Sequence, residues 1–212
     1  MHRNWFDIVV TVMVVLGAVD GLRRGLITKA FDLVGLVIGL VVAARYYDVA
    51  ARFLDRTFNL GTRFVAYLTA AFPDPLRLPQ PGDPLYGLVT ALGPQGAALT
   101  VDSLAASLVN ALGFLLMLIA TGIVVGLIKW PIARLLSHLL GGVVNRVLGL
   151  FFGSAVTVAE LAVGVGLAVP FLSLASLRGL AAALSNSWSG GHLLAISQWI
   201  LGYLRPLFPG GA

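Results

Sequence analysis

Residues 147–169 read VLGLFFGSAVTVAELAVGVGLAV, an apolar run of 23 residues that contains a single charged side chain, Glu160. At about 1.5 Å rise per residue, a helix of this length crosses a hydrocarbon core of about 30 Å. Its small and polar residues recur at helical spacing and therefore share one face: Gly149, Gly153, Thr157, Glu160 and Gly164. The run predicts a transmembrane helix that packs this face against other helices.

The composition of the whole chain sets its class. Hydrophobic residues make up 58% and charged residues 11% of the 212 residues, and the mean hydropathy is +0.95, whereas an average soluble domain is about 25% charged. A soluble protein of this length could not bury so much apolar surface. We therefore predict an all-α, polytopic membrane protein. The net charge of +5 comes from cationic residues that flank apolar segments, which indicates contact with the lipid bilayer and not with nucleic acid.

Four apolar segments are expected to cross the membrane, at about residues 5–20, 26–46, 104–129 and 147–169. Residues 1–170 form the predicted four-helix membrane domain. Within it, residues 48–72 carry polar and apolar faces typical of a helix in the headgroup plane, and a Pro-rich loop follows over residues 73–102. A short amphipathic helix is expected from Pro131. Residues 171–212 are predicted to form amphipathic helices at the membrane surface.

The short connections between the spans carry Arg and Lys, which favour the cytoplasmic side. The first connection holds Arg23, Arg24 and Lys29, and the third holds Lys129, Arg134 and Arg146. Both connections are therefore placed in the cytoplasm. The same count puts both termini and the Pro-rich loop outside.

Glycine pairs four residues apart occur in every predicted span. Such pairs allow membrane helices to approach closely. We expect close packing within one bundle, or between copies in a homo-oligomer, at these positions: Gly17, Gly21, Gly35, Gly39, Gly122, Gly126, Gly149 and Gly153.

Glu160 is the only glutamate of the chain. An isolated charge at the bilayer centre costs about 3 kcal/mol on insertion scales, so its side chain should face the interior of the bundle. Residue counts place Asn110 and Thr11 at a similar depth, and Arg45 could reach them from the end of the second span. The sequence thus predicts an intramembrane polar cluster of Glu160, Asn110, Thr11 and Arg45. Either a structural role or a proton or ion site fits this cluster.

Two further acids have local explanations. Asp32 follows Lys29 by three residues, which predicts an ion pair along one helix face. Asp7 lies near the outer end of the first span, where helix capping or hydration is expected. The sequence contains no His-Glu-x-x-His motif, no Gly-x-Ser-x-Gly elbow and no phosphate-binding loop, and it has no cysteine. We therefore expect neither catalysis, nor a bound metal, nor a cofactor.

Four short motifs, in this order and spacing, resemble those of the colicin V production protein (CvpA) family. They are Asn4-Trp5-Phe6-Asp7-Ile8, Arg24-Gly25-Leu26-Ile27, Ala44-Arg45-Tyr46-Tyr47 and Asn145-Arg146-Val147-Leu148-Gly149 with Gly153. The resemblance covers roughly residues 4–169 and makes Asp7, Arg24, Gly25, Asn145 and Arg146 the matching motif residues. It implies a bacterial inner-membrane protein of four spans, connected with toxin export and envelope homeostasis, without established chemistry. The chain departs from the family at Thr28-Lys29, where a basic-acidic pair is common.

Two functions remain open at this point. The first is an accessory or scaffold protein of the inner membrane that acts through protein partners. The second is a small transporter or channel subunit with a polar site around Glu160. A transporter requires a polar cavity that opens to one face, whereas a scaffold requires exposed grooves or small-residue surfaces.

Overall fold

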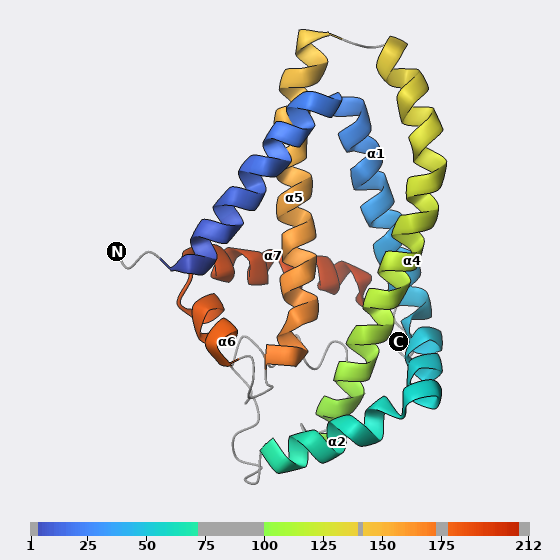
Figure 1. The fold of residues 1–212 in the computed structure, drawn as a ribbon, viewed down its shortest axis with the longest axis vertical. Helices are drawn as coiled ribbons and strands as arrows, with labels where there is room; N and C mark the ends of the chain where they lie inside the picture. The colour runs from blue at the N-terminus through green and yellow to red at the C-terminus, as the bar shows by residue number, and fades with distance from the viewer. Residues whose placement is uncertain (1–3, 72–99, 140–141, 173–177, 208–212) are drawn as a thin grey trace.

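The computed structural model describes residues 4–71, 100–139, 142–172 and 178–207 (Figure 1). Within these ranges the regular structure is helical, in the order α1 (Trp5–Phe58), α2 (Leu60–Ala71), α4 (Val101–Leu139), α5 (Val143–Leu172), α6 (Arg178–Ser185), α7 (Trp188–Leu204) and the 3-10 turn η3 (Arg205–Leu207). The predicted all-α fold is therefore confirmed for the described residues. The predicted Pro-rich loop lies outside them as far as residue 99.

Helix α1 bends sharply at Gly25. This residue has φ 81° and ψ 168°, a conformation that an L-residue rarely adopts, and the helix continues on both sides of it. Figure 1 shows the two limbs, residues 5–24 and 26–58, as an inverted V. Asn4 begins the first limb by accepting a hydrogen bond from the Phe6 backbone N–H at 3.2 Å. The connection between the first two apolar segments is thus made at one glycine.

Three helices are long and apolar enough to cross a membrane: α1, the segment Val101–Lys129 of α4, and the segment Val143–Val169 of α5. Because α1 is divided at Gly25, its two limbs contain the first and second predicted spans. The number of membrane crossings, four, stays a prediction.

The single helix that was expected over residues 48–72 is divided in two in the structure. Residues up to Phe58 complete α1, and α2 begins after Asn59, which takes the left-handed conformation with φ 52°. The Asn59 N–H donates to the Asp55 carbonyl oxygen at 2.7 Å, and the Gly61 N–H donates to the Asp55 carboxylate at 2.7 Å. Asparagine tolerates the left-handed conformation better than most residues, so the chain turns here.

Proline does not divide α4 where a new helix was expected. The backbone remains helical from Val101 through Pro131 to Leu139, and α5 likewise extends past Pro170 to Leu172. Interior prolines are tolerated in membrane helices because local adjustments and neighbouring groups satisfy the freed carbonyl. The third and fourth predicted spans are therefore parts of longer helices.

Helix α7 belongs to the core of the molecule. It crosses α5 transversely in Figure 1 and contributes Leu193, Leu194 and Leu204 to three buried clusters, which also include residues of α1, α4 and α5. Its other face exposes Trp188, Trp199 and Tyr203. Whether residues 171–212 lie at the membrane surface stays a prediction, but α7 is packed against the long helices.

Candidate functional site

The first limb of α1 and helix α5 cross with their backbones in contact. A Cβ atom added to Gly21 would lie 1.9 Å from the Gly149 carbonyl oxygen, and one added to Gly153 would lie 2.3 Å from the Gly17 carbonyl oxygen. Real Cβ atoms do not approach backbone this closely. Four of the predicted packing glycines therefore act together, and they fix α1 and α5 as one unit.

The other predicted glycine pairs behave differently. A Cβ on Gly35 or Gly39 would meet only side-chain atoms, of Val125 and Leu118, at 3.0 and 3.1 Å, whereas Gly122 and Gly126 have nothing within 4 Å. A glycine that the pair pattern did not mark, Gly113, packs against the α1 backbone, because its Cβ would lie 2.5 Å from the Tyr47 carbonyl oxygen. Gly113 has no glycine four residues before or after it, so the pair pattern could not indicate it.

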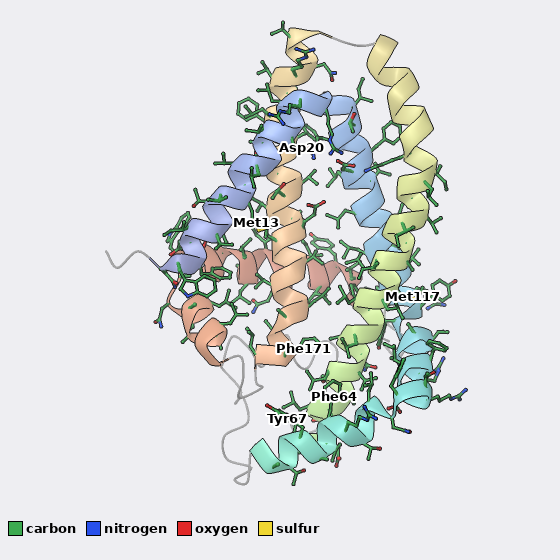
Figure 2. All side chains as sticks on the ribbon, in the orientation of Figure 1. Met13, Asp20, Phe64, Tyr67, Met117 and Phe171 are labelled. Atoms are coloured by element: carbon green, nitrogen blue, oxygen red, sulfur yellow. The ribbon has the colours of Figure 1, made fainter. Side chains whose placement is uncertain are left out.

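Two of the family-like motifs meet at the bend of α1. A Cβ on Gly25 would lie 2.4 Å from the Asn145 Nδ2 atom, so the Arg24-Gly25 and Asn145-Arg146 segments are neighbours in space. Arg24 donates from Nε to the Asp20 carboxylate at 2.7 Å, and Figure 2 shows Asp20 close to the bend. Arg146 is exposed. Arg24, Gly25 and Asn145 therefore lie together at the bend.

A network of ion pairs extends from the bend into the bundle. Lys29, whose exposed fraction is 7%, pairs with Asp20 at 2.6 Å and with Asp32 at 3.4 Å between Nζ and carboxylate oxygens. Lys129 of α4 also pairs with Asp32. The predicted Lys29–Asp32 pair is confirmed. Its extension to Asp20 and Lys129 was missed, because the sequence pattern assigns Lys129 to the connection between the third and fourth spans.

Glu160 borders a cavity of about 200 Å³ beside this network. Its side chain is exposed and not enclosed in the interior of the bundle as expected. Asp32 and Lys129 line the same cavity, together with the glycine pairs of the second limb and of α4 and with apolar side chains. Glu160 interacts electrostatically with Lys29, Asp32, Lys129 and Asp20. Among the described residues it makes no hydrogen bond or ion pair. The same cavity is thus lined by the Glu160 carboxylate, which has no bonded partner among the described residues, and by Asp32 and Lys129 of the ion-pair network.

The structure does not bring together the four residues of the predicted polar cluster. Thr11 is exposed and donates to the Asp7 backbone carbonyl at 2.7 Å, Arg45 is exposed, and Asn110 lines a different cavity between α1, α2 and α4. Glu160 alone lies beside the charged network. Residue counts estimate only the position along each helix, and they do not determine the direction in which each side chain faces.

Asp7 anchors the start of α7. Its Oδ1 atom accepts hydrogen bonds from the Ser187 hydroxyl at 2.6 Å, from the Ser189 hydroxyl at 2.5 Å and from the Ser189 backbone N–H at 2.9 Å. Asn4 also donates from Nδ2 to the Ala183 carbonyl oxygen at the end of α6. A carboxylate at a helix N-terminus is favoured by the helix dipole. Asp7 therefore caps the start of α7, whereas the sequence predicted capping or hydration at the end of its own span.

The described residues contain no group of three or more His, Cys, Asp or Glu side chains that could hold a metal ion. A comparison with curated proteins and one with solved structures found no match. Residues 6–198 match the family described as Colicin V production protein. That range includes the Arg-Gly bend, the ion-pair network, Glu160 and most of α7. The chain belongs to the colicin V production protein family.

Proposed function

We propose that this protein is a non-enzymatic accessory or scaffold protein of the bacterial inner membrane, which supports colicin V production and envelope homeostasis by holding protein partners. Family membership supports the link to colicin V production. The observation that carries the scaffold role is the backbone contact between α1 and α5 at Gly21 and Gly149. Two helices packed backbone to backbone cannot rock against each other without losing the contact, so the unit is suited to presenting fixed surfaces.

The described helices also leave extensive apolar faces for lipid or partners. Helix α4 exposes 72% of Leu127 and 61% of Ile123, and α5 exposes 63% of Phe151. Helices α4 and α5 contact each other little and are held mainly through α1. A partner helix could therefore pack against either of them without displacing the internal contacts.

The membrane arrangement that goes with this proposal has four crossings. Each limb of α1 is long enough to cross, since 20 residues extend about 30 Å, and α4 and α5 supply the other two. The Arg and Lys residues in the short connections favour a cytoplasmic bend of α1, with both termini outside.

A second candidate function, a small transporter or channel subunit, is favoured by the cavity that Glu160, Asp32 and Lys129 line. Ionisable side chains within membrane segments often mark ion or proton pathways. In this reading the carboxylate of Glu160 would carry a proton or a cation.

The variant Glu160→Gln separates the two functions. The amide keeps the size and hydrogen-bonding capacity of the side chain but loses the charge and the titratable proton. If the protein is a scaffold, the Glu160→Gln variant should restore colicin V production to a producer strain that lacks the protein, as the wild type does, at equal membrane abundance. If the protein is a transporter, the variant should be stably inserted in the membrane but inactive. Loss of production in this variant at full abundance would reject the scaffold role.

A further inference from the structure

A second, larger cavity lies where the end of α1, helix α2 and the beginning of α4 converge, at the end of the molecule opposite the bend (Figure 1). It is an open cavity, since Arg52, Asp55 and Asp102 on its walls are exposed, and its volume of about 510 Å³ falls within the usual range of ligand sites, about 300–1,000 Å³. Nothing in the scaffold or transporter proposals uses this cavity, and it stands independently of both.

The cavity exists because two helices diverge from a close crossing. Gly113 of α4 touches the α1 backbone at Tyr47 and Ala51, and toward the start of α4 the two helices separate. Small residues line the walls where larger ones would fill the gap, namely Ala51, Ala105, Ala106 and Gly61. Val65 of α2 and Val109 of α4 add apolar surface.

Charged groups of both signs line the same space. Asp48, Asp55 and Asp102 contribute carboxylates, and Arg52 contributes a guanidinium. Arg52 uses Nη2 to pair with Asp48 at 2.9 Å, which leaves its other N–H donors available. Asp55 accepts one hydrogen bond from Gly61 through Oδ1. Asp102 makes neither a hydrogen bond nor an ion pair with the other described residues.

The depth of the cavity matches the boundary between hydrocarbon and headgroups. The apolar run of the second limb ends at Arg45, and charged residues follow through Arg56. Exposed aromatic side chains surround this region on α1 and α2: Tyr46, Phe53, Phe58 and Tyr67. Figure 2 shows Phe64 and Tyr67 on α2. Aromatic residues of this kind gather at membrane–water interfaces.

We propose that this cavity binds the headgroup of a zwitterionic aminophospholipid such as phosphatidylethanolamine. The primary ammonium donates to Asp102 and to the free oxygen of Asp55, and the phosphate accepts from Arg52, since charge-assisted hydrogen bonds of this kind are strong. The valines and alanines contact the glycerol and the first acyl methylenes. Three carboxylates against one guanidinium disfavour an anionic phospholipid, and a choline headgroup lacks the N–H donors that the carboxylates require.

Native mass spectrometry of the full-length protein tests this proposal. The protein in detergent is titrated with phosphatidylethanolamine, phosphatidylcholine and phosphatidylglycerol of identical acyl chains. One molecule of phosphatidylethanolamine should be retained, with about tenfold preference over the other two, the difference expected from one hydrogen bond to a charged group. Equal retention of the three lipids would overturn the proposal.

Variants assign the retention to the cavity. Asp102→Asn and Arg52→Gln should each lower retention of phosphatidylethanolamine by about tenfold, whereas Arg56→Gln, on the same helix but outside the cavity, should not change it. Ala106→Leu fills the cavity without altering its charge and should also abolish the preference for phosphatidylethanolamine. It provides a second test in case the charge variants do not fold. Unchanged retention in Asp102→Asn and Ala106→Leu would place the lipid elsewhere and refute the site. Saturable binding of O-phosphoethanolamine without retention of the lipid would assign the site to a soluble phosphoamine and also refute it.

Discussion

The substitution Gly21→Ala tests whether the α1–α5 crossing holds the fold together. The added Cβ would lie 1.9 Å from the Gly149 carbonyl oxygen, 2.8 Å from its carbonyl carbon and 2.9 Å from the Gly153 Cα. All three are backbone atoms, so no side-chain rotation relieves the clash. The two helices would have to separate by more than 1 Å, because ordinary contacts begin near 3.4 Å.

The expected loss of stability follows from this separation. Overpacking a well-packed site costs about 1–3 kcal/mol when side chains can adjust, and here only the helices can move. We therefore expect a loss of about 3 kcal/mol or more, which lowers the folded-to-unfolded ratio at least about 100-fold. Since native proteins are stable by only about 5–15 kcal/mol, this is a large fraction of the total.

Thermal unfolding of the purified protein, followed by the fluorescence of its four tryptophans, measures the effect. Gly122→Ala is the matched control, because it makes the same change in a helix where nothing lies within 4 Å of the new atom. Alanine is intrinsically better than glycine in a helix by about 1 kcal/mol, so the control should be neutral or slightly stabilised. If Gly21→Ala melts at the same temperature as Gly122→Ala, the backbone contact does not exist and the reasoning fails.

Three further predictions follow from the ion pairs, the anchored C-terminal helix and the topology. Lys29→Met should destabilise the protein by about 1–3 kcal/mol in chemical denaturation, because the two aspartates lose a buried partner but keep Arg24 and Lys129, and a change below 1 kcal/mol would show that the network contributes little. Asp7→Ala should speed hydrogen exchange of the first amides of α7 and spare α4, since three hydrogen bonds to its carboxylate are lost; unchanged exchange would contradict the anchoring role. Reporter fusions at Gly82, Gly142 and Gly210 should lie outside, inside and outside, and a cytoplasmic Gly82 would reverse the topology.

The sequence was sufficient for the class of protein and for several local features. Composition and continuous apolar runs identify a helical membrane protein, because a chain that is 58% hydrophobic and 11% charged has too little polar surface to stay soluble. The glycine face of residues 147–169 correctly indicated a helix that packs closely on another. The Lys29–Asp32 pair was also predictable, since its two residues lie three positions apart on one helix.

Only the tertiary structure decided which of these local features meet. Gly21–Gly25 and Gly122–Gly126 have the same spacing, yet one pair touches the α5 backbone and the other borders an open cavity. Glu160 was expected beside Asn110 and lies instead beside Asp32 and Lys129. Successive residues of a helix differ by about 100° around its axis, so a small uncertainty in rotation moves a side chain to another face. Contacts between distant helices depend on that rotation and on the crossing angles, which local sequence does not determine.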